Sequence, residues 1–206
     1  KNVPKQNWNK LWESNFHPIA VGDQCYVRAK FHEPKPEFPY ELVITPKMSF
    51  GTGHHATTSQ MLRQQLKIDH TGKRVFDIGC GTGILGIMAA KLGAAEVDAC
   101  DVEDWSVENT LENAAVNQVS VLAYQGTAQD RPPQEYEVLL ANINRNVLLE
   151  ELPTYTKLLA PEGHLIMSGF RPSDLDLLNE KAMACGLALK EQNQEGEWCC
   201  AVYRQQ

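Results

Sequence analysis

Short apolar runs alternate with amphipathic stretches along most of the chain. From Ala56 onward, runs rich in Val, Ile and Leu are separated by segments in which apolar residues recur every three or four positions. The first pattern is typical of buried strands and the second of helices. We predict strands at 74–78, 96–100, 120–124, 136–141 and 163–168. We predict helices around 61–68 and at 84–92, 106–117, 144–159 and 173–185. This alternation predicts a doubly wound α/β fold, in which a mostly parallel sheet is covered on both faces.

The C-terminal end breaks this alternation. Strand-like runs at 187–192 and 198–204 flank a turn at Glu195-Gly196, without a helix between them. We therefore expect a C-terminal antiparallel hairpin at one edge of the sheet. We expect Trp198 to pack against this hairpin.

The N-terminal end is also different. A helical pattern over residues 8–16 is followed by two strand-like runs, at 26–31 and 41–45. These elements are too few for a domain with its own core. We therefore divide the chain into an N-terminal extension over residues 1–46 and a main domain over residues 47–206.

Charge and hydropathy narrow the classes of function. The chain of 206 residues has 19 Lys and Arg against 26 Asp and Glu, which gives a net charge of −7. This charge argues against direct nucleic-acid binding, which favours clustered basic residues, and it is compatible with a basic protein partner. No apolar run approaches the roughly 18 to 20 residues of a membrane-spanning helix, so we expect no membrane association.

The spacing of cysteines and histidines gives no sign of a metal site. The six cysteines form no C-x-x-C pair, and His54 and His55 are adjacent, so their side chains rarely reach one ion. We expect no bound metal. Cysteines without such spacing are usually buried thiols in a reducing compartment, and we therefore expect a cytoplasmic protein.

A glycine cluster between the first strand of the main domain and its helix is the strongest candidate for ligand binding. Its sequence is Asp77-Ile78-Gly79-Cys80-Gly81-Thr82-Gly83. In an open α/β sheet, ligands bind beyond the carboxyl ends of the strands, where glycines allow close approach of the backbone. Asp101 ends the next strand, twenty-two positions after Gly79. A carboxylate there can accept hydrogen bonds from both hydroxyls of a ribose, so we predict a nucleoside ligand.

Two nucleoside cofactors are compatible with this cluster. The segment Gly81 to Gly86 matches G-x-G-x-x-G, which alone would favour NAD. Asp77 favours S-adenosylmethionine instead, because its charge would repel a diphosphate and attract an ammonium group. An NAD-dependent oxidoreductase would also need a substrate domain, for which the chain after Asn142 leaves little room. A third alternative is a binding module that holds the cofactor without turnover.

A wider set of motifs accompanies the glycine cluster. The most specific is Phe50-Gly51-Thr52-Gly53-His54, which is followed by Thr57-Thr58. The others are Leu92-Gly93-Ala94, Ala141-Asn142-Ile143, Ser168-Gly169 and Glu197-Trp198. From about Trp8 to its end, the sequence resembles the ribosomal protein L11 methyltransferase family (PrmA type). The resemblance implies a class I S-adenosylmethionine-dependent methyltransferase with a Rossmann-like fold, whose catalytic domain spans residues 47–206. Its substrate would be amino groups of the basic ribosomal protein L11, on lysine side chains, the N-terminus or both.

The resemblance also implies roles for individual residues. Thr58 begins a helix whose free amides can hold a carboxylate. Asn142 would face the reactive methyl group and is the candidate catalytic residue, because it can orient the acceptor amine while the proton leaves to water. The predicted cofactor-binding residues are Phe50, Gly53, Thr58, Asp77, Gly79, Gly81, Gly83, Asp101 and Asn142.

The chain departs from the family pattern beside the acceptor site. The family usually has small or apolar residues where this chain has Asn144-Arg145, and an aliphatic residue where it has Phe170. We expect these three side chains to lie near the acceptor amine. Another protein lysine or a small molecule therefore stays open as an alternative substrate.

Two further expectations concern loops and length. The segment Ser49–His55 has two glycines and a polar tip, and we expect it to be a lid over the cofactor. Family members carry an additional domain before the Trp8 segment, and no such domain fits into the residues before Trp8 here. We therefore expect normal cofactor binding but weak binding of a protein substrate by this chain.

Overall fold

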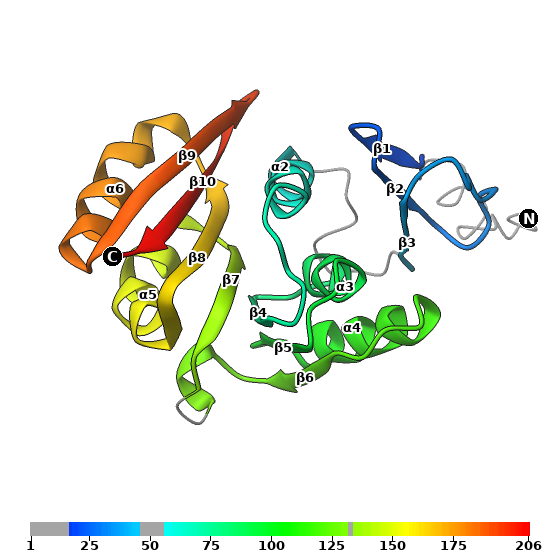
Figure 1. Ribbon diagram of the computed structural model, residues 1–206, viewed down its shortest axis with the longest axis horizontal. Helices are drawn as coiled ribbons and strands as arrows, with labels where there is room; N and C mark the ends of the chain where they lie inside the picture. The colour runs from blue at the N-terminus through cyan, green and yellow to red at the C-terminus, as the bar shows by residue number, and fades with distance from the viewer. Residues whose placement is uncertain (1–16, 46–55, 132–133) are drawn as a thin grey trace, which may run out of the picture.

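A computed structural model of the chain describes residues 17–45, 56–131 and 134–206. Its main element is a seven-stranded sheet with helices on both faces (Figure 1). The strands of this sheet are β4 (Arg74–Ile78), β5 (Glu96–Asp101), β6 (Leu122–Gln125), β7 (Tyr136–Asn142), β8 (Leu159–Phe170), β9 (Leu187–Glu195) and β10 (Trp198–Gln205). The helices are α2 (Ala56–Gln65), α3 (Ile84–Lys91), α4 (Asp104–Val116), α5 (Arg145–Leu158) and α6 (Leu175–Ala184), with short 3-10 helices η1 (Ala128–Asp130) and η2 (Pro172–Asp174). Each strand and helix predicted from Ala56 onward is present.

The order of strands is β6-β5-β4-β7-β8-β10-β9. Strands β4 to β8 pair in parallel, whereas β10 pairs antiparallel with both β8 and β9. The predicted doubly wound sheet with a C-terminal antiparallel hairpin at one edge is therefore confirmed. Between β4 and β7 the connections change direction, and such a switch point leaves a crevice at the carboxyl ends of the strands.

Side chains alternate between two cores, one on each face of the sheet. In β4, Val75 packs into the core beneath α3, and Phe76 packs into the core beneath α5. In Figure 1, α2, α3 and α4 lie on the first face, and α5 and α6 lie on the second. Because both faces are covered, the central strands carry apolar residues without strict alternation.

A second, three-stranded sheet precedes the main one. It consists of β1 (Ile19–Val21), β2 (Cys25–Arg28) and β3 (Tyr40–Val43), with β1 antiparallel and β3 parallel to β2. The sequence pattern predicted the second and third of these strands and missed β1, which has only three residues. The boundary predicted between residues 46 and 47 lies outside the described residues and stays a prediction, as does the helix over 8–16.

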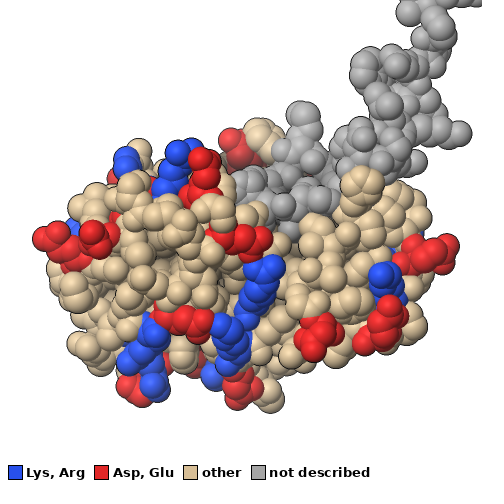
Figure 2. Space-filling model, turned by 90° about the horizontal axis from the view of Figure 1, so that it is seen from above, with Lys and Arg blue, Asp and Glu red and all other residues tan. Residues whose placement is uncertain are grey.

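The surface carries charges of both signs. On the face in Figure 2, basic and acidic side chains lie beside one another in several places. Among the described residues, the helices are too short or too polar to cross a membrane.

Candidate functional site

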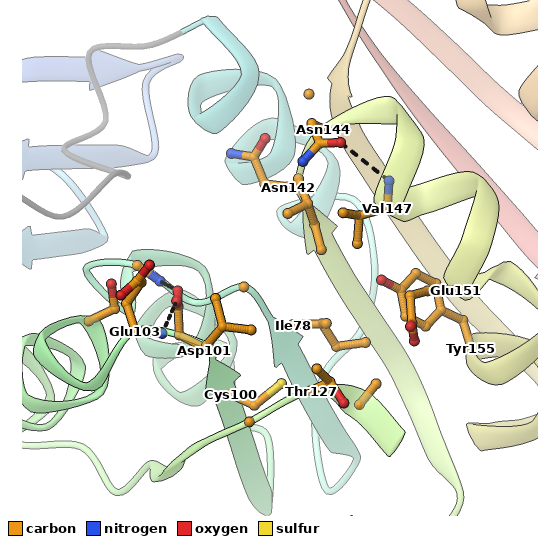
Figure 3. A pocket seen from close by; sticks show the side chains of 18 of the residues that line it. Ile78, Cys100, Asp101, Glu103, Thr127, Asn142, Asn144, Val147, Glu151 and Tyr155 are labelled. Atoms are coloured by element: carbon orange, nitrogen blue, oxygen red, sulfur yellow. Dashed lines mark hydrogen bonds between the residues drawn. The ribbon is translucent and has the colours of Figure 1, made fainter. Parts of the chain in front are cut away.

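A cavity of about 590 Å³ lies at the carboxyl ends of β4, β5 and β7 (Figure 3). Its position matches the switch point of the strand order, where ligands of this fold class bind. Four of the predicted site residues line it: Gly79, Gly81, Asp101 and Asn142. The cavity therefore brings together residues that lie up to 63 positions apart in the sequence, from Gly79 to Asn142.

The glycine loop owes its shape to three left-handed residues. Gly79, Gly81 and Gly83 have φ angles of 71°, 56° and 77°, which side chains other than glycine rarely adopt. The amides of Gly79 and Cys80 donate to the Cys100 carbonyl at 2.8 and 3.0 Å, which holds the loop against the end of β5. Gly83 does not line the cavity. A Cβ atom there would lie 2.7 Å from the Thr110 side chain, so Gly83 allows α3 and α4 to pack.

The carboxylate of Asp101 is fixed in the wall of the cavity. Its Oδ2 accepts a hydrogen bond from the Gly81 amide at 3.0 Å, and its Oδ1 accepts one from the Glu103 amide at 3.1 Å. Each carboxylate oxygen has a further lone pair. Asp101 can therefore still accept hydrogen bonds from two adjacent hydroxyl groups, as a ribose presents them.

Asn142 lies across the cavity from Asp101, at the end of β7. Its Nδ2 donates to the Thr58 hydroxyl at 3.4 Å, and its Oδ1 is buried and has no hydrogen-bond partner in the described part of the chain. Thr58 itself is fully buried, and its neighbour Thr57 lines the cavity. Buried polar atoms are usually hydrogen-bonded, so the free amide oxygen is available to an N–H group of a ligand.

Asp77 lies behind the glycine loop and is not among the residues that line the cavity. Its Oδ2 accepts from the Gly86 amide of α3 at 2.9 Å, and its Oδ1 is buried without a partner. Burial raises the pKa of Asp77 to about 7. Asp77 is therefore placed to hold the loop and α3 together, and the geometry gives no support to the predicted direct contact with a cofactor ammonium group.

The three residues expected beside the acceptor amine lie in three different environments in the structure. Asn144 lines the cavity, and its Oδ1 accepts from the amides of Asn146 and Val147, so that it caps α5. Arg145 is exposed and forms an ion pair with Asp174. The expectation for Phe170 is wrong: it is 1 % exposed and packs in the core beneath α5 and α6. Successive residues of a strand face opposite sides, so Phe170 faces the core where its neighbour Gly169 lines the cavity.

Several residues that line the cavity were not predicted. Trp198, which was expected to pack against the hairpin, is half-buried and lines the cavity, and the Arg171 guanidinium lies 5.8 Å from the centre of its ring. Two others, Glu151 and Tyr155, lie one turn apart on α5. The remaining unpredicted residues of this wall are Thr57, Cys100, Val102, Glu103, Trp105, Ser106, Gly126, Thr127, Ala128, Ile143, Val147 and Gly169. Thr57, Ile143 and Gly169 belong to the motifs that carry the family resemblance. The only signal of the others in the sequence is their position after predicted strands or on one face of a predicted helix.

The remaining predictions fall on residues 46–55, outside the described part of the chain. They concern Phe50, Gly53 and the lid over Ser49–His55. The same holds for His54 and His55. Within the described ranges, no group of His, Cys, Asp and Glu side chains is arranged to hold a metal ion.

Comparison with known proteins connects this geometry to one family. The model of the family described as ribosomal protein L11 methyltransferase (PrmA) matches residues 1–206. The ribosomal protein L11 methyltransferase of Porphyromonas gingivalis is 46% identical over 200 residues, which are 95% of this chain and 68% of that protein. The protein of the same name from Phocaeicola vulgatus is 39% identical over 206 residues, 98% of this chain and 73% of that protein.

Solved structures have the same fold. The crystal structure of a ribosomal protein L11 methylase from Lactobacillus delbrueckii subsp. bulgaricus superposes with a TM-score of 0.85 at 24% identity, covering 93% of this chain and 99% of that one. The N-methyltransferase NodS from Bradyrhizobium japonicum, in complex with S-adenosyl-L-homocysteine, superposes with a TM-score of 0.61 at 14% identity, covering 74% and 89%.

Proposed function

Because the chain belongs to the ribosomal protein L11 methyltransferase family, we propose that it methylates amino groups of ribosomal protein L11. The chain is an S-adenosylmethionine-dependent methyltransferase, and the acceptors we propose are lysine side chains, the N-terminal amine or both. One observation of geometry carries this proposal. A ribose acceptor, Asp101, and an unpartnered amide oxygen, on Asn142, face each other across one cavity.

We assign the parts of the cofactor to the parts of the cavity. Asp101 binds the ribose, because hydrogen bonds from two backbone amides already hold both of its carboxylate oxygens in a fixed orientation. The loop at Gly79 and Gly81 lies against the methionine part, since glycine permits close backbone approach. Thr57 and Thr58 lie in the first turn of α2, where free amides favour the methionine carboxylate. Asp77 and Gly83 contribute by holding this loop in position.

S-adenosylmethionine supplies a methyl group on a positively charged sulfur, which an amine lone pair can displace. Asn142 Oδ1 accepts an N–H of the incoming amine and thereby directs its lone pair at the methyl group. Thr58 fixes the Asn142 amide through its hydroxyl. A lysine amine has a reference pKa of about 10.4 and must lose a proton before attack. We assign that proton to water, because Asn142 cannot take it.

We also propose the cellular setting. A basic ribosomal protein suits the acidic charge of the chain, and the enzyme contacts no nucleic acid or membrane directly. The reaction takes place in the cytoplasm. All six cysteines are free thiols, as is usual in a reducing compartment.

A transfer assay tests this proposal. Purified ribosomal protein L11 is incubated with S-adenosylmethionine and the chain, and methylated sites are mapped by mass spectrometry. We expect the mass of L11 to increase by one or more methyl groups, each located on an amino nitrogen. Methylation of other lysine proteins or small amines at equal efficiency, or none of L11, would reject L11 as the substrate.

The catalytic role of Asn142 gives a sharper prediction in the same assay. Asn142→Ala removes the oxygen that orients the amine, and misorientation of this kind costs about 100-fold in rate. We expect kcat to fall by about 10- to 100-fold while the chain still binds S-adenosylhomocysteine. Asn146→Ala, which changes an exposed asparagine in the first turn of α5 that does not line the cavity, is the matched control and should retain full activity. A variant Asn142→Ala with unchanged kcat would remove Asn142 from the mechanism.

A further inference from the structure

The side of the cavity formed by α5 carries two polar groups that the proposed mechanism does not use. Glu151 and Tyr155 lie four positions apart, so they occupy the same face of the helix. Both line the cavity. In Figure 3 they project toward it from the side opposite Asp101. They are therefore separated from the groups assigned to the ribose and to the acceptor amine.

Both residues present a buried polar atom without a partner. Tyr155 is 0% exposed, and its hydroxyl has no hydrogen-bond partner in the described part of the chain. Glu151 Oε2 is also a buried atom without a hydrogen-bond partner in the described part of the chain. Native proteins rarely leave such atoms unsatisfied, and each one calls for an explanation. Two of them in the wall of one cavity point to a ligand with complementary groups.

The two groups differ in what they can do. Glu151 Oε1 accepts from Gln129 Nε2 at 2.9 Å, which fixes the carboxylate and leaves Oε2 as an acceptor. Burial raises the pKa of Tyr155 above its ordinary value, so its hydroxyl keeps its proton at neutral pH and can donate it. The wall thus offers one acceptor and one donor to the same ligand.

The surroundings of these two atoms are apolar. Ile78, Cys100 and Ala128 also line the cavity, and they belong to the same core cluster as Tyr155. An apolar slot with a few placed polar groups is suited to a flat heteroaromatic ring. The ring must carry a hydrogen-bond donor for Glu151 and an acceptor for Tyr155. Adenine has both, in its exocyclic amino group and its ring nitrogens.

We propose that Glu151 and Tyr155 recognise the adenine base of the cofactor. Glu151 Oε2 accepts a hydrogen from the exocyclic amino group, and the Tyr155 hydroxyl donates to a ring nitrogen. This assignment rests on the proposed function, because it takes the ligand to be an adenosyl compound. It makes these two residues the determinants of base specificity. A base with a carbonyl in place of the amino group would set an acceptor against Glu151 Oε2, and such mismatches are strongly disfavoured.

Calorimetric titration with two probes tests the proposal. The probes are S-adenosylhomocysteine and S-inosylhomocysteine, in which a carbonyl replaces the amino group. We expect the wild-type chain to prefer the adenosyl compound by about 100-fold or more. Glu151→Gln introduces an amide that can donate to the carbonyl, so this preference should fall at least about tenfold. Tyr155→Phe should weaken S-adenosylhomocysteine binding by about tenfold.

Glu150→Gln provides the matched control. Glu150 is the exposed neighbour on α5 and does not line the cavity, so this variant should behave as wild type with both probes. Thermal unfolding of each variant checks that it is folded. An adenosyl-to-inosyl preference that Glu151→Gln leaves unchanged overturns the base assignment alone. Failure of the wild-type chain to bind S-adenosylhomocysteine overturns the proposed function, and this inference with it.

Discussion

At the scale of single residues, Asp101 shows how a site can be prepared before its ligand arrives. Two backbone amides, from Gly81 and Glu103, fix its carboxylate at the edge of the cavity. A ligand therefore meets an oriented acceptor and does not have to immobilise a mobile side chain, which reduces the entropic cost of binding.

Removal of this carboxylate gives a direct prediction. Asp101→Ala should weaken binding of S-adenosylhomocysteine by about 1.5 to 3 kcal/mol, the usual cost of lost charge-assisted hydrogen bonds. Isothermal titration calorimetry measures the difference. Asp176→Ala removes an exposed carboxylate on α6 and should bind as the wild type does. Equal affinity of Asp101→Ala and wild type would show that Asp101 does not hold the ribose.

Asp77 gives a prediction about pH. Its pKa is raised by burial from 3.8 to about 7 in the folded chain. Between these values the folded state holds the proton more tightly than the unfolded state. The free energy of unfolding therefore falls as the pH rises from about 4 to about 7, and this contribution is constant above that range.

Asp77→Asn isolates this contribution, because asparagine can still accept from the Gly86 amide but does not ionise. As the pH is raised from about 4 to about 8, the free energy of unfolding of the variant should increase relative to that of wild type, by a few kcal/mol at most. Urea denaturation at the two pH values measures the gain. Parallel stability curves for the two proteins would show that Asp77 does not titrate in this range.

The sequence was informative about some site residues and silent about others. Asp101 and Asn142 follow apolar strands directly, and parallel strands end at one edge of a sheet, so their meeting could be predicted. Glu151, Tyr155 and Trp198 reach the same cavity from a helix and a hairpin. Their place depends on how these elements pack on the sheet, which local sequence patterns do not specify.

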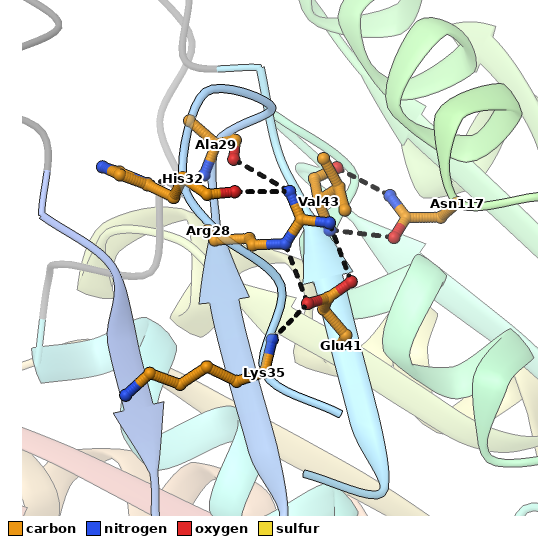
Figure 4. A network of polar contacts seen from close by, with 7 residues as sticks. All are labelled: Arg28, Ala29, His32, Lys35, Glu41, Val43 and Asn117. Carbon is orange, nitrogen blue, oxygen red and sulfur yellow. Dashed lines mark hydrogen bonds and ion pairs between the residues drawn. The ribbon is translucent and has the colours of Figure 1, made fainter. Parts of the chain in front are cut away.

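At the scale of elements, α4 connects the glycine loop to the N-terminal sheet through a row of asparagines. Asn113 Nδ2 donates to the Thr82 carbonyl at 2.9 Å, and its Oδ1 accepts from the Thr45 amide at 2.9 Å. One turn further, Asn117 bonds both backbone groups of Val43, as Figure 4 shows. The cofactor loop and the N-terminal sheet are therefore held by the same face of one helix.

Asn117→Ala tests this attachment. The variant loses two hydrogen bonds to β3, at 2.9 and 2.7 Å, and we expect a loss of about 1 to 3 kcal/mol in the free energy of unfolding. Urea denaturation gives the overall loss, and hydrogen exchange of the Val43 amide shows whether β3 has loosened. Glu108→Ala, an exposed change on the same helix, is the control. If the Val43 amide exchanges fast in the wild-type chain, or if its exchange is no faster in Asn117→Ala, this role of Asn117 is contradicted.

Element boundaries show what periodicity can and cannot reveal. The helices α4 and α5 begin and end within a few residues of the predicted positions, because long amphipathic patterns are distinctive. Strand β8 begins at Leu159, four residues before the prediction. Pro161 and Gly163 made that segment resemble a loop, although it continues from α5 without a connecting turn.

At the scale of the whole molecule, the acidic net charge has a consequence for substrate encounter. The chain carries a net charge of −7, while the proposed protein substrate is basic. Opposite charges speed association, and salt screens them over about 10 Å at about 0.1 M ionic strength. The face of the molecule in Figure 2 carries both signs beside one another, so the prediction rests on the net charge and not on a patch seen on that face.

We therefore expect the apparent KM for the protein substrate to rise several-fold between about 0.05 M and about 0.3 M salt, with a smaller change in kcat. Initial rates of methyl transfer at varied L11 concentration measure both constants. Affinity for S-adenosylhomocysteine, titrated in the same buffers, provides the comparison and should change less. A KM that is independent of salt would exclude electrostatic attraction as a part of substrate recognition.

The overall architecture could be predicted from the alternation of strands and helices, including the antiparallel edge. The three-stranded N-terminal sheet could not, because its strands have only three or four residues and pair partly in parallel. Its position depends on long-range contacts, such as those of Asn117 with Val43, that no local pattern encodes.

The central claim is that one cavity holds the cofactor with its reactive end toward Asn142. A crystal structure of the chain with S-adenosylhomocysteine tests this most directly. We predict that the ribose hydroxyls lie within hydrogen-bond distance of the Asp101 carboxylate and that the sulfur faces Asn142. A molecule bound elsewhere, or bound here with its sulfur directed away from Asn142, would contradict the account.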